Sequence, residues 1–446
     1  MSRPSRLLGV LACVYVALIP LGWSPFPANV QWADVALLGV LGAALAQLRT
    51  VQGSPLRSLA GGGAKQGQAL DRLVGLYLIG STASLLTTTD PRQTALELVK
   101  QDSLAAVYLV ISRLCRDGRL RQRLVAWAAA SAAAVAGISL LAWKGARWFG
   151  WWIDSPLLEP WAVPGLGAVL RLKGPLHSPG LLCNYLTFAW PLLLGLALQQ
   201  RRHRVAWGLG AAAVLAAGWL TATYSLIGLI GAGLVVAWPL WARAPRLAPL
   251  RAAVIAAWVA GFLVLNAALA VYVYDARWTT GYDRTRAASP YIYTFHEAGK
   301  GARTATLSVS YDWMSYGLLK RTAMEAFLRR PWTGVGAGTF QRETERAYQA
   351  GALHAPYRRM DPHSEWCGRL AETGLIGLGS LLLLWAGILR AVGRVRRAAG
   401  RTSWLPRAVI AGLLGLLVNS VNVDIMNFRF LWVGLGWLRT WDEGAA

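Results

Sequence analysis

Apolar and polar positions follow one another along this chain in long blocks. Most apolar blocks approach the length at which a helix spans a bilayer, about 20 residues, and polar segments separate them. The apolar runs cover residues 7–23, 32–47, 73–86, 104–114, 124–143, 181–198, 205–220, 225–241, 252–273, 374–389, 408–421 and 428–438. This pattern predicts an all-α polytopic membrane protein with about twelve transmembrane helices.

One long polar segment interrupts the series and is the only part large enough to fold on its own against a membrane. We therefore predict three regions. Residues 1–273 form transmembrane helices 1–9, residues 274–372 form a large and mostly helical loop domain, and residues 373–446 form transmembrane helices 10–12.

The two halves of this loop differ in composition. Residues 274–311 are rich in Tyr, Thr, Ser and Arg, which predicts irregular structure. Aromatic rings and hydroxyl groups suit sugar binding, although a belt of Tyr at the membrane interface explains them equally well. Residues 318–328 have a helical pattern, which Pro331 and the glycine-rich stretch 334–338 end. That stretch lacks the Gly-Lys-Ser/Thr of a phosphate-binding P-loop.

The basic residues change the interpretation of the charge. A net charge of +24 would suggest nucleic acid binding in a soluble protein. Here the Arg residues cluster in short segments between apolar runs, as at 113–123, 201–204 and 390–401. Such clusters mark cytoplasmic loops, so we expect both termini inside, the large loop in the periplasm, and no nucleic acid partner.

The cysteines and the first residues add two exclusions. Cys13, Cys115, Cys183 and Cys367 have no paired spacing, so neither a disulfide framework nor a metal site is predicted. Residues 7–21 follow a basic start without a small-residue cleavage site, and we expect a retained first membrane helix.

The strongest candidate chemistry lies where the long loop meets the next apolar run. His363 follows Pro362, which favours a loop or the first turn of a helix. Histidine accepts a proton near neutral pH, although a lone His at a helix start is more often structural. Glu365, Arg369 and Glu372 then recur at helical spacing.

Three stretches resemble the O-antigen ligase and O-antigen polymerase superfamily. That family carries a His followed by a small polar residue, then a Glu and a Gly-x-x-Gly at the start of a membrane helix, after a large periplasmic loop. The matching residues here are Arg321, the stretch 331–340, His363, Ser364, Glu372, Gly374 and Gly377. Upstream, Arg171, Gly174, Pro175 and Asn184 resemble another family element, and the resemblance extends over residues 171–421.

The resemblance implies a GT-C-like glycosyltransferase that needs neither metal nor cofactor. Its donor is a glycan on undecaprenyl diphosphate, its acceptor is a lipid-anchored sugar, and the anomeric carbon inverts. His363 is the implied catalytic base, with Glu372 orienting it or bonding the acceptor hydroxyl; a helix-start carboxylate is the competing interpretation of Glu372. Arg321 and Arg171 are the implied ligands of the donor diphosphate.

One position departs from the family. Where the family carries an Arg between two central helices, this chain has Leu226, which cannot replace a guanidinium. Either a second phosphate-binding cation comes from Arg171, Lys173 or Lys320, or the donor differs.

Alternatives from other classes stay open. The preferred hypothesis is an O-antigen ligase of lipopolysaccharide biosynthesis in the bacterial inner membrane, with its active site on the periplasmic side. The second is a polymerase that uses a second carrier-linked repeat as acceptor. A polysaccharide transporter is disfavoured because the centres of the predicted helices lack ionisable residues, and a scaffold leaves the motif match unexplained.

Overall fold

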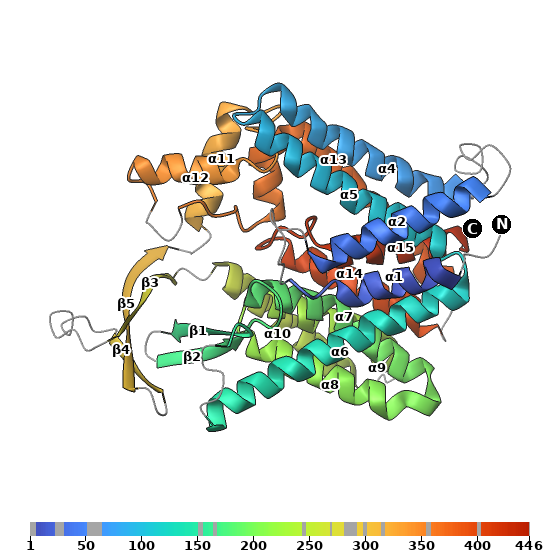
Figure 1. Ribbon diagram of the computed structural model, residues 1–446, viewed down its shortest axis with the longest axis horizontal. Helices are drawn as coiled ribbons and strands as arrows, with labels where there is room; N and C mark the ends of the chain where they lie inside the picture. The colour runs from blue at the N-terminus through green and yellow to red at the C-terminus, as the bar shows by residue number, and fades with distance from the viewer. Residues whose placement is uncertain are drawn as a thin grey trace.

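The computed structural model shows a mainly helical chain (Figure 1). The structure describes residues 6–22, 31–50, 65–149, 155–163, 167–242, 247–267, 270–280, 292–297, 301–313, 317–353, 358–398 and 403–445. Its first helices are α1 (Arg6–Leu18), α2 (Trp32–Thr50), α4 (Lys65–Thr82), the 3-10 turn η2 (Ala83–Leu86), α5 (Pro91–Leu114) and α6 (Gly118–Phe149).

The remaining helices follow a short β-hairpin. They are α7 (Pro179–Gln199), the 3-10 turn η3 (Arg201–His203), α8 (Arg204–Leu220), α9 (Leu226–Trp241), α10 (Ala248–Ala267), α11 (Gly317–Arg329), α12 (Phe340–Gln349), α13 (Glu365–Ala398), α14 (Trp404–Asn419) and α15 (Arg429–Glu443). Local sequence explains several of their starts. Asp90 and Ser178 cap α5 and α7 by accepting backbone N–H groups, and each is followed by Pro in the first turn.

Each predicted apolar run coincides at least in part with one of these helices. Within the described ranges, four helical segments are long and apolar enough to cross a membrane: Gln68–Leu86, Gly118–Ala146, Pro179–Gln199 and Glu365–Ala398. The chain is therefore a membrane protein by length and composition of its helices. That all twelve runs cross the membrane, and that the large loop is periplasmic, stay predictions.

The first half of the large loop corrects the sequence interpretation. We predicted irregular structure there within a mostly helical domain, but the backbone forms β3 (Ala270–Thr280), β4 (Ile292–Glu297) and β5 (Gly301–Trp313). They pair antiparallel in the order β3-β5-β4. The physical reason is the share of Val, Thr, Tyr and Trp in β3 and β5, residues that favour extended backbone. The helical expectation holds only for the second half, where α11 and α12 lie.

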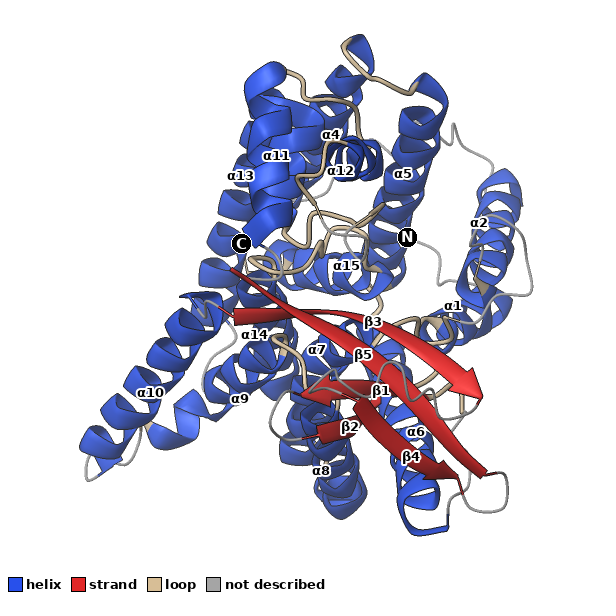
Figure 2. Cartoon of the chain, turned by 90° about the vertical axis from the view of Figure 1, so that its left-hand side faces the viewer, coloured by secondary structure: helices blue, strands red, loops and turns tan. Residues whose placement is uncertain are grey.

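A second sheet is a hairpin between α6 and α7. Its strands β1 (Leu158–Val163) and β2 (Gly167–Leu172) pair antiparallel, with Glu159 opposite Arg171. The strands of both sheets gather at one end of the helices, where Figure 2 shows them crossing in front of the bundle. This end is the one that also carries α11 and α12 in Figure 1.

The core is built around the short last helix, α15, whose residues are almost all buried. Trp437 stacks on Phe188 of α7, with ring centroids 6.0 Å apart. Gly434 allows this approach, because a Cβ there would lie 2.6 Å from Cε2 of Phe188. Large apolar side chains such as Leu209 and Trp219 are exposed on the outer helices, as a lipid-facing surface requires.

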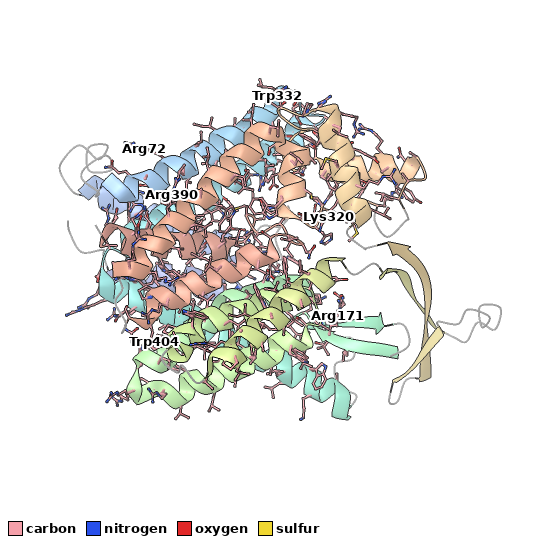
Figure 3. All side chains as sticks on the ribbon, turned by 180° about the vertical axis from the view of Figure 1, so that it is seen from behind. Arg72, Arg171, Lys320, Trp332, Arg390 and Trp404 are labelled. Carbon is pink, nitrogen blue, oxygen red and sulfur yellow. The ribbon has the colours of Figure 1, made fainter. Side chains whose placement is uncertain are left out.

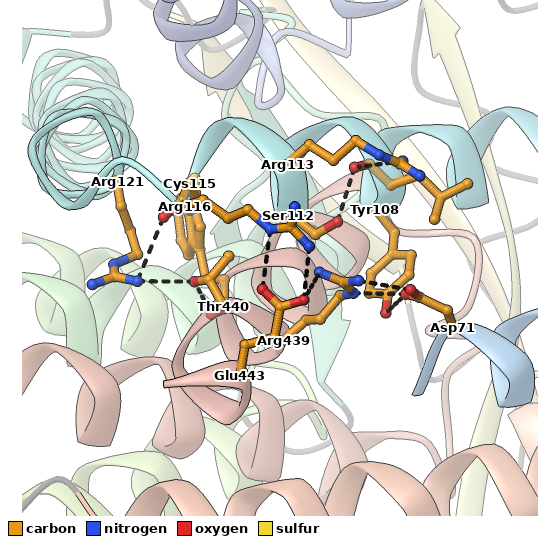
Figure 4. A network of polar contacts seen from close by, with 12 residues as sticks. Asp71, Tyr108, Ser112, Arg113, Cys115, Arg116, Arg121, Arg439, Thr440 and Glu443 are labelled. Atoms are coloured by element: carbon orange, nitrogen blue, oxygen red, sulfur yellow. Dashed lines mark hydrogen bonds and ion pairs between the residues drawn. The ribbon is translucent and has the colours of Figure 1, made fainter. Parts of the chain in front are cut away.

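Two pairs of basic side chains lie toward opposite ends of the bundle. Figure 3 shows Arg171 and Lys320 at the end with the strands, and Arg72 and Arg390 toward the other end. At that other end the side chains of α4, α5, α6 and α15 contribute to the network of Figure 4. Arg439 there binds Asp71 through two hydrogen bonds of 2.7 Å, which anchors α15 to α4.

Candidate functional site

The site predicted from sequence is organised by a kink in α13. Its first turns run from Glu365, and the backbone leaves the helical region at Gly374, with φ 62° and ψ −161°. The kink frees two backbone N–H groups from the helix ladder. Leu375 donates to the carbonyl of Pro331 (2.8 Å), and Ile376 donates to that of Trp332 (3.1 Å). The segment after α11 thus completes the hydrogen bonding of α13.

That segment, residues 331–338, is called the glycine turn below. The glycine turn also donates hydrogen bonds to α13: the backbone N–H of Val335 donates to the carbonyl of Ala371 (3.0 Å), and that of Gly336 to the carbonyl of Glu372 (2.9 Å). Gly334 lies in the left-handed region with φ 69°, and a Cβ on it would collide with the peptide between Glu372 and Thr373. The motif glycines therefore allow two backbones to lie in direct contact.

Residues of η2 and of its connection to α5 support the glycine turn from the other side. Thr89 donates its backbone N–H to the carbonyl of Val335 (2.9 Å), and the hydroxyls of Thr87 and Thr333 lie 2.6 Å apart. Ala337 donates to the hydroxyl of Ser84 (3.1 Å). Three segments far apart in sequence thus form one backbone-bonded platform.

Glu372 lies where the glycine turn meets α12. Its carboxylate accepts the backbone N–H of Phe340, the first residue of α12, at 3.2 Å. The bond satisfies one of the backbone N–H groups that a helix start leaves without an intrahelical partner. Glu372 therefore joins α13 to α12. It acts at a helix start, as the competing interpretation proposed, but the helix is α12.

Gly377, the second motif glycine, lies one turn beyond the kink. A Cβ there would collide with the hydroxyl and Cβ of Thr373. The hydroxyl of Thr373 in turn donates to the carbonyl of Arg369 at 2.7 Å. Gly377 thus leaves room for a side chain that bonds the helix on the opposite side of the kink.

His363 lies two residues before Glu365, the first residue of α13, outside the helix interior as the preceding Pro362 predicts. Its backbone is left-handed, with φ 47°, and Ser364 then caps the helix by accepting the N–H of Cys367 (3.3 Å). Burial lowers the pKa of the His363 imidazole, and the nearby carboxylate of Asp361 opposes that shift. The imidazole is thus neutral at neutral pH and able to accept a proton.

The segment that holds the start of α13 was missed at the sequence level. Residues 420–428, called the α14–α15 turn below, bond to it repeatedly. Glu365 donates its N–H to the carbonyl of Ser420 (2.9 Å) and accepts the N–H of Met426 on its carboxylate (3.0 Å). Trp366 donates its indole N–H to the Ser420 hydroxyl (2.9 Å). A usable signal was present, since Asn422, Asp424 and Asn427 interrupt two apolar runs.

Glu365 also pairs with Arg369 one turn along α13. The Nε of Arg369 donates to Oε1 of Glu365 at 2.8 Å, and both side chains are almost completely buried. The guanidinium lies 5.4 Å from the ring centroid of Tyr77 on α4. The prediction that Glu365 and Arg369 lie on one face of the helix is therefore confirmed, and that face is turned toward the protein interior.

The two cations of α11 have different environments. Lys320 is partly buried, and its ammonium donates to the side-chain oxygen of Asn422 at 2.9 Å. Arg321 is exposed and pairs with Glu325 on its own helix at 2.9 Å. Lys320, rather than Arg321, is thus joined to the α14–α15 turn and through it to the start of α13.

Arg171 and Lys173 lie at the end of the β1–β2 hairpin. Arg171 forms an ion pair with Glu159 across the two strands, and Lys173 donates its backbone N–H to the carbonyl of Leu157 at 2.9 Å. Figure 3 shows Arg171 and Lys320 at the same end of the molecule. The structure therefore gathers the four candidate cations at one end, on two separate elements.

The position that departs from the family pattern begins α9. Leu226 is its first residue, and the preceding Ser225 accepts the side-chain N–H of Asn184 at 2.9 Å. Asn419 of α14 donates to Asn184 at 2.9 Å and accepts the backbone N–H of Gly228 at 3.1 Å. Buried amides thus join α7, α9 and α14 beside the position where the family carries an Arg.

Metal ligation was not expected. Among the described residues, no three His, Cys, Asp or Glu side chains converge as metal ligands would. A reaction without metal stays a prediction.

Comparison with known families identifies part of the chain. A family model described as O-antigen ligase matches residues 211–382, a span that runs from α8 through the glycine turn to the middle of α13. It includes His363, Glu372 and both motif glycines. No curated protein matches the chain.

Proposed function

Because the chain belongs to the O-antigen ligase superfamily, we propose that it transfers a glycan from undecaprenyl diphosphate to a sugar hydroxyl. The family supports a membrane glycosyltransferase of the ligase or polymerase type. The acceptor we propose is the core oligosaccharide of a lipid A-anchored molecule, and the membrane is the bacterial inner membrane with the site on the periplasmic side.

The observation that carries this proposal is the environment of His363. A neutral imidazole, held at the start of a membrane helix by a cap and a kinked platform, is suited to take a proton from a hydroxyl. In the proposed step, His363 removes the proton from the acceptor hydroxyl. The oxygen attacks the anomeric carbon, the bond from that carbon to the diphosphate oxygen breaks, and the carrier diphosphate leaves with inversion.

The leaving diphosphate needs positive charge. We assign this role to Lys320 and Arg321 of α11 and to Arg171 and Lys173 of the hairpin end. Figure 3 shows Lys320 and Arg171 at the end of the molecule that carries the strands. Glu372 supports the reaction by positioning: its contact with Phe340 fastens α12 and the glycine turn to the helix that His363 precedes. The proposal requires neither a metal nor a cofactor.

Purified protein in detergent tests the reaction directly. A carrier-linked glycan is supplied with either a core lipid or a second carrier-linked repeat, and the products are separated by size. New core-linked glycan supports ligation, whereas longer carrier-linked glycan supports the polymerase alternative. No new glycosidic bond with either acceptor would contradict the proposed function, and activity lost in EDTA and restored by a divalent ion would contradict the metal-free step.

Two variants of Arg321 and one control test its role at the donor diphosphate. Arg321→Lys keeps the charge and loses the bidentate fork, so donor affinity is expected to fall by about 1–3 kcal/mol, the range for charge-assisted hydrogen bonds. Gln349→Ala, on the exposed face of α12, is the control. Donor binding unchanged in Arg321→Ala would remove Arg321 from the site.

A further inference from the structure

The α14–α15 turn touches both kinds of residue that the proposed reaction uses. Its Ser420 and Met426 bond to Glu365, two residues after His363. Its Asn422 bonds to the ammonium of Lys320. A single turn therefore sets the position of the candidate base and of one candidate cation, although it lies beyond the matched family region.

The candidate cations differ in what opposes their charge. Arg171 is paired with the carboxylate of Glu159, and Arg321 with that of Glu325. The bond from Lys320 to Asn422 ends on a neutral amide oxygen, and no carboxylate of the described residues forms an ion pair with this ammonium. Burial lowers the pKa of Lys320, as expected for a cation that is partly desolvated without a carboxylate.

We propose that Asn422 is a positioning residue for donor binding: its neutral oxygen holds the Lys320 ammonium in place and leaves the charge uncompensated for the donor diphosphate. This inference rests on the proposed function and deepens it. An aspartate at position 422 would hold the same ammonium but would neutralise it. An amide is therefore the side chain that gives position without charge compensation.

A purely structural role of Asn422 and a positioning role predict opposite orders of damage for two substitutions. If the contact only joins α11 to the turn, Asn422→Asp keeps it as an ion pair, and Asn422→Ala is the more damaging change. If Asn422 keeps the charge available, Asn422→Asp is the more damaging change for diphosphate binding, because a carboxylate competes with the ligand.

The experiment measures undecaprenyl diphosphate binding to the purified full-length protein in detergent, together with its melting temperature. We expect Asn422→Asp to weaken binding by about tenfold or more, the effect of losing a charge-assisted bond, and Asn422→Ala to weaken it less. The melting temperature of Asn422→Asp should equal or exceed that of the wild type. Gln349→Asp, an exposed amide on α12, is the matched control and should bind normally.

A double-mutant cycle gives a second test of whether the two residues act together. Lys320→Gln alone should lose about as much affinity as Asn422→Asp, and the combined variant should lose no more, because both act through one ammonium. Independent, additive losses would overturn the inference.

The same measurement distinguishes failure of this inference from failure of the proposed function. If the wild type binds undecaprenyl diphosphate and Asn422→Asp binds it equally well, the role of Asn422 is overturned and the proposed function stands. Absence of undecaprenyl diphosphate binding by the wild type overturns both. Phosphatidylglycerol is the second probe: if it binds as tightly and with the same dependence on residue 422, the ammonium serves a phospholipid headgroup and the inference is overturned.

Discussion

Gly334 and Gly374 pack backbone against backbone, and each does so in the left-handed region, with φ 69° and φ 62°. A Cβ on Gly374 would collide with the peptide between Trp332 and Thr333. The two glycines therefore let the glycine turn approach the kink of α13 closely enough for four backbone hydrogen bonds, those of Val335, Gly336, Leu375 and Ile376. His363 precedes the helix that this contact bends.

Replacing Gly374 by Ala should destabilise the protein. The substitution adds backbone strain of about 1–3 kcal/mol, because φ 62° with ψ −161° is a conformation essentially restricted to glycine, and it forces a Cβ against backbone that has no room to move, at a further cost of about 1–3 kcal/mol. The measurement is the melting temperature of the purified protein. Gly379→Ala is the matched control, because Gly379 is on the same helix and its Cβ would meet nothing within 4 Å. Equal melting temperatures for both variants would contradict the packing described.

Neutralising Glu365 should be far more damaging than neutralising Glu325. Both carboxylates pair with an Arg four residues away, but the Glu365–Arg369 pair is buried and the Arg321–Glu325 pair is exposed. Glu365→Gln weakens a hydrogen bond to a buried guanidinium, which still interacts with Asp424, at a cost of about 1–3 kcal/mol, whereas Glu325→Gln should cost about 0.3–0.5 kcal/mol. Thermal unfolding of the two variants decides this, and a similar small shift in both would mean that Glu365 does not hold Arg369.

His363→Ala should lower the rate of glycan transfer by about a hundredfold to ten-thousandfold, the contribution of a general base. Donor binding and melting temperature should stay close to the wild type. The three quantities are measured on the same preparation. A stable, donor-binding variant with near wild-type transfer would remove His363 from the chemistry, and a parallel loss of stability and binding would assign it a structural role.

The pH dependence of the wild type follows from the lowered pKa of His363. The neutral imidazole is populated at more acidic pH than for an ordinary His, so the acidic limb of the rate profile should lie below about pH 6.5. Below that value the unfolded chain binds more protons at this site than the folded chain does, so His363 makes the folded state less stable as pH falls. Transfer rates and melting temperatures between about pH 5 and 8 test both statements. A limb that stays unchanged in His363→Ala would belong to another group.

The orientation of the chain is open to chemical labelling. Gln349 of α12 should be periplasmic and Arg119, near the start of α6, cytoplasmic, because the Arg clusters mark the inner side. Single Cys residues at these positions are introduced into a background whose four native cysteines are replaced. A membrane-impermeant thiol reagent should label only position 349 in cells with a permeable outer membrane. Labelling at position 119 alone would invert the topology.

Local chemistry determined much of this architecture. Runs of apolar residues with few charges and near bilayer-spanning length favour helices, and a helix overlaps each of the predicted runs. Pro362, Ser364 and the glycines at 334–338 likewise set a helix start and a turn through their own backbone preferences. The sheet β3-β5-β4 was missed because its pairing joins residues far apart in the chain, such as Ala270 and Trp313.

The composition of the site depended on contacts that no local pattern contains. Glu365 and Arg369 were placed on one face by helical spacing, but only the packing of the α14–α15 turn buried that face, through a bond between Glu365 and Met426, 61 residues away. The same packing gave Lys320 a neutral partner in Asn422, 102 residues away. Helical periodicity relates residues that are only a few positions apart. Burial and the choice of hydrogen-bond partner depend on which distant segments pack together, so only the tertiary structure decided them.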